Sequence, residues 1–183
     1  MTKQRYILLD RDGVINQDSD DFIKSPEQWL PLDGSLEAIA LLNKHGYKVV
    51  VVTNQSGLAR GLFDAAMLEQ IHAKMQRMTA EKGGKIEAIY FCPHGPDDDC
   101  NCRKPKPGLL EQFATDNHVS LIGMTVIGDS LRDLQAAQAV GASPILVKTG
   151  KGQKTLTENP KLNIPVFENL YDAANYLTAR PQT

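Results

Sequence analysis

YILLDRDGV, residues 6–14, is the stretch that decides the class of fold. Its apolar first half predicts a strand buried on both faces, and its second half places two aspartates directly after that strand. Four further β-rich runs occupy residues 49–52, 86–91, 125–127 and 145–147. Most of these runs are continuously apolar rather than alternating, which is typical of the strands of a parallel sheet.

Helical patterns separate these runs. Apolar residues recur every three or four positions from Leu68 to Met78 and from Leu170 to Leu177, with Asp64 and Asn169 as candidate N-caps. Strands that alternate with helices predict an α/β fold with a central parallel sheet and helices on both faces. A short strand is also expected near residues 166–167, before the last helix.

Length and composition fit one globular domain over residues 1–183. Twenty basic and 22 acidic residues give a net charge of −2, which argues against a general nucleic-acid or membrane binder. The apolar runs are far shorter than the roughly 20 residues of a membrane helix, and the first residues do not form a signal peptide. We therefore expect a cytoplasmic monomer with neither a nucleic acid nor a membrane as partner.

Polar side chains follow four of the predicted strands. Asp10 follows the first, Thr53 the second, Cys92 the third and Asp129 the fourth. Ligands of an open parallel sheet bind beyond the carboxyl ends of its strands, so these side chains are expected at one edge.

The carboxylates at this edge predict a cation site. Asp10 and Asp12 share a parity, and a helix that begins near Ser130 would place Asp129 and Asp133 on one side of its first turn. Such crowding of like charge needs a cation, and Mg²⁺ suits oxygen ligands. In the alternative interpretation Asp10 is a turn residue at the end of a strand and Asp129 is an N-cap. Both aspartates directly follow a buried strand, which favours a cation site over this alternative.

Two loops offer phosphate ligands. Residues 53–57, TNQSG, combine a hydroxyl with backbone N–H groups in a turn that contains glycine. Lys104 lies in a loop that Pro105 and Pro107 stiffen, so its ammonium is held ready for a phosphoryl group. Each feature alone also fits an ordinary solvated loop.

The segment CPHGPDDDCNC, residues 92–102, predicts a zinc site. It contains all three cysteines of the chain and one histidine, the donor set of a closed tetrahedral Cys₃His site. A loop without a metal is the alternative for the histidine. Four protein ligands leave no position for water, so the zinc is expected to be structural and to fix the stem of Lys104. The predicted ligands are Cys92, His94, Cys100 and Cys102.

Asp10-x-Asp12-Gly13, Thr53-Asn54, Lys104 and Gly128-Asp129-x-x-x-Asp133 resemble, in order and context, the four motifs of haloacid-dehalogenase (HAD) superfamily phosphohydrolases. The likeness spans residues 6 to about 147. It implies a three-layer Rossmann-like fold. The intervals between the motifs leave no room for a cap domain, so the active site is expected to be open.

Carried over to the matching positions, the resemblance implies that Asp10 is the nucleophile and forms an aspartyl-phosphate. Asp12 would be the general acid and base. Mg²⁺ would be held by Asp10, the backbone carbonyl of Asp12, and Asp129.

The same resemblance gives Thr53 and Lys104 the role of binding phosphoryl oxygens and stabilising the transition state. Asp133 would be a supporting residue that orients either Lys104 or a metal-bound water. In place of the Lys or Arg that relatives often carry after the last motif's first aspartate, this chain has Ser130.

More narrowly, residues 9–13, 52–61 and 102–105 resemble the heptose-bisphosphatase branch of the superfamily, whose nearest relatives are histidinol-phosphate phosphatases. The likeness implies removal of the 7-phosphate of a heptose 1,7-bisphosphate on the route to lipopolysaccharide core. The alternatives are a histidinol-phosphate phosphatase, a polynucleotide 3′-phosphatase or a zinc-stabilised interaction module. Acidic residues at 18–21 either accept hydrogen bonds from sugar hydroxyls or form a solvated loop. The expected substrate-binding residues are Asp18, Asp21, Thr53, Asn54, Gln55, Ser56, Arg103 and Lys104.

Overall fold

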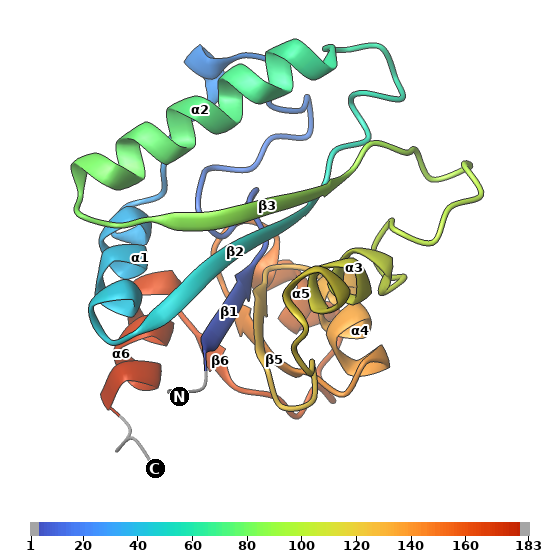
Figure 1. Cartoon of the computed structure of the whole chain (residues 1–183). Helices are drawn as coiled ribbons and strands as arrows, with labels where there is room; N and C mark the ends of the chain where they lie inside the picture. The colour runs from blue at the N-terminus through green and yellow to red at the C-terminus, as the bar shows by residue number, and fades with distance from the viewer. Residues whose placement is uncertain (1–3, 180–183) are drawn as a thin grey trace.

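In the computed structural model, which describes residues 4–179, one parallel sheet forms the centre of the molecule (Figure 1). Its order in the described chain is β3-β2-β1-β4-β5-β6, and every neighbouring pair is parallel. The strands are β1 (Arg5–Leu9), β2 (Tyr47–Asn54), β3 (Ile86–Cys92), β4 (Thr125–Gly128), β5 (Ser143–Val147) and β6 (Val166–Phe167). The prediction of a parallel sheet is confirmed.

Helices cover both faces of this sheet (Figure 1). They are η1 (Pro26–Gln28), α1 (Ser35–Lys44), α2 (Ala65–Glu81), α3 (Gly108–Asn117), α4 (Leu131–Ala139), α5 (Gly152–Glu158) and α6 (Leu170–Ala179). Both predicted caps are confirmed. Asp64 accepts a hydrogen bond from the Met67 N–H at 2.8 Å, and Asn169 accepts one from the Asp172 N–H at 2.9 Å.

The core has two halves, one on each face. Apolar residues of α1, α2 and α6 pack with Trp29 on one face, and those of α3 and α4 pack on the other. Alternate side chains of β1 enter opposite halves: Ile7 and Leu9 belong to the first, and Leu8 to the second. All three are fully buried, which confirms that β1 is covered on both sides.

The end of β2 and the helix α5 differ from the prediction. β2 continues past the apolar run at 49–52, because Thr53 and Asn54 still pair with Phe91 and Cys92 of β3. Both residues therefore end a strand instead of opening a loop, which fixes their backbone. α5 was not expected, since its sequence GQKTLTE has no clear apolar face.

No separate cap domain occurs within residues 4–179, as expected. None of the described helices is both long and apolar enough to cross a lipid bilayer.

Candidate active site

A cavity of about 220 Å³ opens at the carboxyl edge of the sheet. Among the residues named from the sequence, those that line it are Asp10, Asp12, Asp18, Thr53, Asn54, Gln55, Ser56, Arg103, Lys104 and Asp129. Asp21 is exposed and does not line it, and Asp133 is buried behind Lys104. The lining also includes three cationic residues that sequence reasoning missed, Arg60, Arg132 and Lys151.

Three carboxylates converge at the floor of this cavity and directly behind it. Asp10, Asp129 and Asp133 each place one oxygen within 4.8 Å of the others. Burial, and then the charge of Asp133, raise the pKa of Asp10 to about 6. Burial, and then the charge of Asp10, raise the pKa of Asp129 to about 9. The raised pKa values reflect desolvation first and repulsion between neighbouring carboxylates second, so a cation would stabilise the ionised forms of both aspartates.

This donor set fits a hard divalent cation, because such an ion takes oxygen ligands and would remove the excess charge. Backbone without side chains surrounds the Asp129 carboxylate. A Cβ on Gly13 would lie 1.9 Å from Asp129 Oδ2, and a Cβ on Gly150 would lie 2.3 Å from the same atom. Both glycines adopt positive φ, so space and backbone conformation alike require glycine there.

Lys104 links two of the carboxylates. Its Nζ donates to Asp133 Oδ1 at 2.7 Å, to Asp10 Oδ1 at 3.0 Å and to the Val52 carbonyl at 2.8 Å. Burial lowers the pKa of Lys104, but Asp10 and Asp133 outweigh it and raise that pKa to about 12. The ammonium is therefore charged and held beside the nucleophile candidate.

Asn54 fixes the backbone that carries this lysine. The Asn54 side chain accepts from the Lys104 N–H at 3.0 Å and donates to the Lys104 carbonyl at 3.2 Å. The Asn54 side chain therefore positions the backbone of Lys104 and also lines the cavity.

Asp133 is held by the start of α4. Its Oδ2 accepts from the Ser130 N–H at 3.1 Å and from the Ser130 hydroxyl at 2.8 Å, which forms a capping box. Burial raises the pKa of Asp133, but Lys104 dominates the balance, and the net shift is downward. Ser130, not Asp129, is the N-cap, which removes the cap interpretation of Asp129. Asp129 Oδ2 instead accepts from the Lys151 N–H at 2.8 Å.

Asp12 stands apart from the three converging carboxylates and is paired with Arg11. Arg11 donates to Asp12 Oδ1 from Nε at 3.1 Å and from Nη2 at 2.9 Å. Asn16 donates to the same oxygen at 2.9 Å, and Gln55 donates to Asp12 Oδ2 at 3.1 Å. Burial opposes these contacts, but together they lower the pKa of Asp12. Sequence reasoning missed Arg11, although a cation between two strand-end aspartates was a usable signal.

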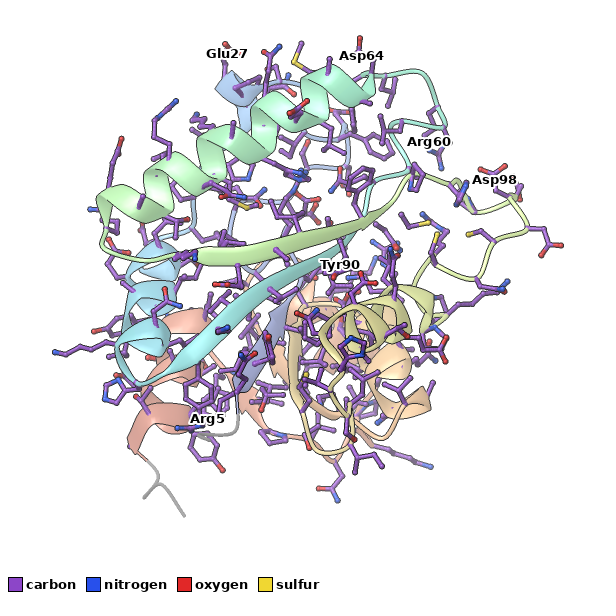
Figure 2. The ribbon with its side chains drawn as sticks, in the orientation of Figure 1. Arg5, Glu27, Arg60, Asp64, Tyr90 and Asp98 are labelled. Carbon is purple, nitrogen blue, oxygen red and sulfur yellow. The ribbon has the colours of Figure 1, made fainter. Side chains whose placement is uncertain are left out.

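Arginines surround the opening of the cavity. Arg60 lies in the loop between β2 and α2, at the same end of the sheet as Asp98 and opposite Arg5 (Figure 2). Burial, and then Arg132, lower the pKa of Arg103, and Arg60 adds to the effect. Among residues 4–179, none of these three guanidinium groups makes a salt bridge. They form a cluster of positive charge without a carboxylate partner, which suits a bound anion.

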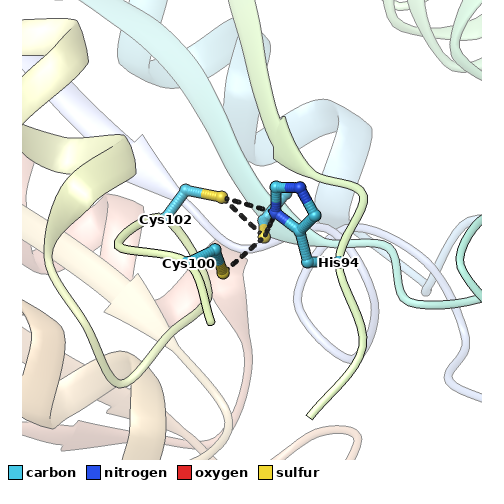
Figure 3. A group of neighbouring side chains, drawn as sticks. His94, Cys100 and Cys102 are labelled. Carbon is cyan, nitrogen blue, oxygen red and sulfur yellow. Dashed lines mark hydrogen bonds between the residues drawn. The ribbon is translucent and has the colours of Figure 1, made fainter. Parts of the chain in front are cut away.

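The second metal candidate lies in the loop after β3. His94, Cys100 and Cys102 point toward one another (Figure 3), and with Cys92 all four donor atoms lie within 4.8 Å of each other. Cys92 Sγ is 3.8 Å from Cys100 Sγ and 3.5 Å from His94 Nδ1. The Cys92 and Cys100 sulfur atoms have the separation of about 3.8 Å expected around a tetrahedral zinc, whereas Cys102 Sγ lies 2.7 Å from Cys92 Sγ. The fit to zinc therefore rests on the chemistry of the gathered donors, three thiols and one imidazole.

This cluster is tied to the stem of Lys104. Arg103 donates from Nη1 to the His94 carbonyl at 3.3 Å, and Lys106 donates to the Cys100 carbonyl at 2.8 Å. The geometry agrees with the expected mechanical link between the Cys/His loop and the lysine.

Comparisons with known proteins agree with this geometry. Family models match for polynucleotide kinase 3 phosphatase, over residues 7–132, and for HAD-hydrolase-like proteins, over residues 101–173. The chain is similar to D-glycero-beta-D-manno-heptose-1,7-bisphosphate 7-phosphatases of Bordetella bronchiseptica, at 58% identity over 84% of this chain and 86% of the relative, and of Pseudomonas aeruginosa, at 51% over 93% and 96%.

Solved structures are also similar. D,D-heptose 1,7-bisphosphate phosphatase from B. bronchiseptica, complexed with magnesium and phosphate, has a TM-score of 0.92 at 54% identity and covers 94% of this chain and 97% of its own. The phosphatase from Burkholderia thailandensis has a TM-score of 0.77 at 42% identity, with coverages of 96% and 99%. The HAD fold expected from the motifs is confirmed.

Proposed function

The chain belongs to the family of D-glycero-beta-D-manno-heptose-1,7-bisphosphate 7-phosphatases, within the HAD-like hydrolases, and we propose that it hydrolyses the 7-phosphate of this heptose bisphosphate. The reaction supplies the route to activated heptose for lipopolysaccharide core. The observation that carries the proposal is the cavity itself. It joins Asp10, Lys104 and Asp129 at its floor to arginines at its opening that form no salt bridge within residues 4–179.

In the first half-reaction an oxygen of Asp10 attacks phosphorus, and the bond from phosphorus to the sugar oxygen breaks. Because Arg11, Asn16 and Gln55 favour the ionised form of Asp12, this carboxylate takes up a proton from solvent when the substrate binds. Asp12 then gives that proton to the leaving oxygen, so the sugar departs as an alcohol. In the second half-reaction water attacks the phosphorus of the aspartyl-phosphate, and Asp12 takes the proton of that water. Inorganic phosphate leaves and Asp10 is restored as a carboxylate.

Lys104 and Thr53 bind the oxygens of the transferring phosphoryl group in this scheme. The Lys104 ammonium needs no reorganisation, because Asp133 and the Val52 carbonyl already hold it beside Asp10. Mg²⁺, held by Asp10, Asp129 and the backbone carbonyl of Asp12, would neutralise phosphate charge as it develops.

The arginine cluster supports a bisphosphate over histidinol phosphate. A second phosphate offers anionic oxygens to Arg60, Arg103 and Arg132, whereas the ammonium and imidazole of histidinol phosphate offer them no second anion. The acidic loop does not reverse this preference, because Asp18 and Asp20 lie 3.6 and 3.9 Å from the Lys151 ammonium. A sugar-hydroxyl contact is proposed for Asp18, which lines the cavity, and not for the exposed Asp21.

We further propose that zinc in the cluster of Cys92, His94, Cys100 and Cys102 is structural. Four protein ligands close its coordination, and the contacts of Arg103 and Lys106 carry its rigidity to Lys104.

Phosphate release with Mg²⁺ present tests the function. The kcat/KM should be highest for the heptose bisphosphate, compared with histidinol phosphate and with an oligonucleotide 3′-phosphate, and the β anomer is expected to be preferred. Asp10→Asn should abolish turnover. An equal or higher kcat/KM for either competing substrate would contradict the proposed substrate. Activity in Asp10→Asn would contradict the proposed mechanism.

A further inference from the structure

Arg11 is a fully buried cation that the proposed reaction does not use. It lies between Asp10 and Asp12 in the sequence, and its side chain has no exposed surface. A buried guanidinium is stable only when its N–H groups are satisfied, so its partners show what it is built to hold.

The side chain is held at three points. Besides the two contacts to Asp12 Oδ1, its Nη2 lies 3.2 Å from Asp12 Oδ2 and donates to Gln55 Oε1 at 3.3 Å. Gln55 in turn donates to Asp12 Oδ2 at 3.1 Å and to Thr53 Oγ1 at 2.9 Å. Arg11 and Gln55 therefore hold both oxygens of Asp12 in one orientation.

His72 supplies the third point. Its Nε2 lies 3.1 Å from Arg11 Nη1, and it comes from α2, 61 residues away in the sequence. His72 is 8% exposed, and the ring of Phe91 lies beside it with centroids 6.2 Å apart. Burial, and then the charge of Arg11, lower the pKa of His72 to about 3. The imidazole is neutral, so Nε2 has a lone pair to accept the Arg11 N–H.

We propose that His72 is a positioning residue for proton transfer: it fixes the far end of Arg11, and Arg11 with Gln55 aims the Asp12 carboxylate at the leaving oxygen. This inference rests on the proposed function, because it takes Asp12 as the general acid. A histidine that only packs in the core would affect folding without favouring one leaving group over another.

The leaving group separates these two roles. A sugar alkoxide needs a proton from Asp12 to depart, whereas p-nitrophenolate departs readily without one. We expect His72→Phe to slow formation of the phosphoenzyme from the heptose bisphosphate by about tenfold to a hundredfold, part of the ~10²–10⁴ that general acid catalysis supplies. The pre-steady-state burst of p-nitrophenolate from p-nitrophenyl phosphate should change by less than about twofold, and KM for the sugar should stay the same.

A matched pair of variants distinguishes loss of the hydrogen bond to Arg11 from a general loss of folding. Gln at position 72 reaches the site of Nε2 with an acceptor oxygen, and Asn is too short to do so, although both are polar. His72→Gln should restore the rate on the sugar to within about threefold, and His72→Asn should not. Thr79→Ala is the control for α2, since Thr79 is fully buried and its hydroxyl donates only to the Met75 carbonyl among the hydrogen bonds of the described residues.

Equal slowing of both substrates in His72→Phe, or equal rates in the Gln and Asn variants, would overturn the inference. Failure of the wild-type protein to hydrolyse the heptose bisphosphate would instead refute the proposed function, so the two failures are distinguishable.

Discussion

At the scale of single residues, Lys104 shows how a buried ion pair can hold a cation ready for phosphate. Its ammonium touches Asp10, which faces the cavity, and Asp133, which does not. The two carboxylates offset the desolvation of the lysine, and in the proposed mechanism Asp133 would keep the ammonium in place when Asp10 accepts a phosphoryl group and loses its charge.

Asp133→Asn tests this division of tasks. The variant leaves a buried lysine with one carboxylate partner fewer, which costs about 3–5 kcal/mol of stability for a broken buried pair. We also expect kcat to fall by roughly 10²–10³, the range for a lost electrostatic donor to the transition state. Chemical denaturation and steady-state kinetics measure the two effects. Glu158→Gln, which removes an exposed carboxylate of α5, should change neither. Wild-type kcat in Asp133→Asn would contradict the role.

Arg132 allows a second test at this scale. If it contacts the second phosphate, Arg132→Gln should raise KM for the heptose bisphosphate by about 10–100-fold, because a hydrogen bond to a charged group contributes ~1.5–3 kcal/mol. The KM for a monophosphate should change little, and so should kcat. Arg77→Gln, an exposed change on α2, is the matched control. Equal KM changes for both substrates would remove Arg132 from the second-phosphate site.

The residues at the cavity floor were predictable from the sequence, and so was Arg103 at its opening, but Arg60 and Arg132 were not. Asp10, Thr53 and Asp129 each follow or end a buried strand, so the topology alone brings them to one edge. Arg60 and Arg132 lie on a loop and a helix, where an arginine is usually solvated, so nothing in their spacing indicates a shared ligand. They meet because the loop after β2 and the first turn of α4 both border the same cavity, which no periodicity in the sequence indicates.

At the scale of elements, apolar runs predicted the strands because burial on both faces leaves a continuous signal. The end of β2 was missed because hydrogen bonds to β3, rather than side-chain character, extend it through Thr53 and Asn54. The short helix α5 was missed because its sequence, GQKTLTE, has no clear apolar face. Its position follows from contacts with the Asp129 backbone, since the Thr155 hydroxyl donates to the Asp129 carbonyl at 2.9 Å.

The metal-binding role of the Cys/His loop, residues 92–102, is tested by removing one of its ligands. Cys100→Ala removes one zinc ligand, and we expect loss of bound zinc together with turnover, while the far side of the sheet stays folded. Metal analysis, phosphate release and circular dichroism measure the three properties. Asp99→Ala, an exposed change in the same loop, should retain zinc and activity. Full activity in zinc-depleted wild-type protein would show that the metal does not fix Lys104.

At the scale of the whole molecule, a net charge of −2 hides a strong local imbalance. Asp10 and Asp129 have pKa values raised to about 6 and about 9, both above the ordinary 3.8 of an aspartate. Without a cation these two aspartates therefore bind more protons in the folded protein than in the unfolded chain between about pH 4 and pH 9. Stability from these two groups is present at low pH and is lost as the pH rises through their folded pKa values.

Magnesium should reverse this dependence, since it binds ionised carboxylates and displaces their protons. At a hundredfold excess over Kd, binding stabilises the folded state by about 2.7 kcal/mol. At ~2–4 °C per kcal/mol this predicts a rise in Tm of roughly 5–11 °C.

Because protons compete with the ion, a fixed Mg²⁺ concentration should raise Tm more at about pH 8.5 than at about pH 6. Differential scanning calorimetry with and without Mg²⁺ measures this, with zinc held constant. In Asp129→Asn the Mg²⁺ effect should disappear at both pH values, because the variant loses a ligand and its titrating proton together. A Tm increase in wild-type protein that is the same at both pH values would contradict proton displacement from these aspartates.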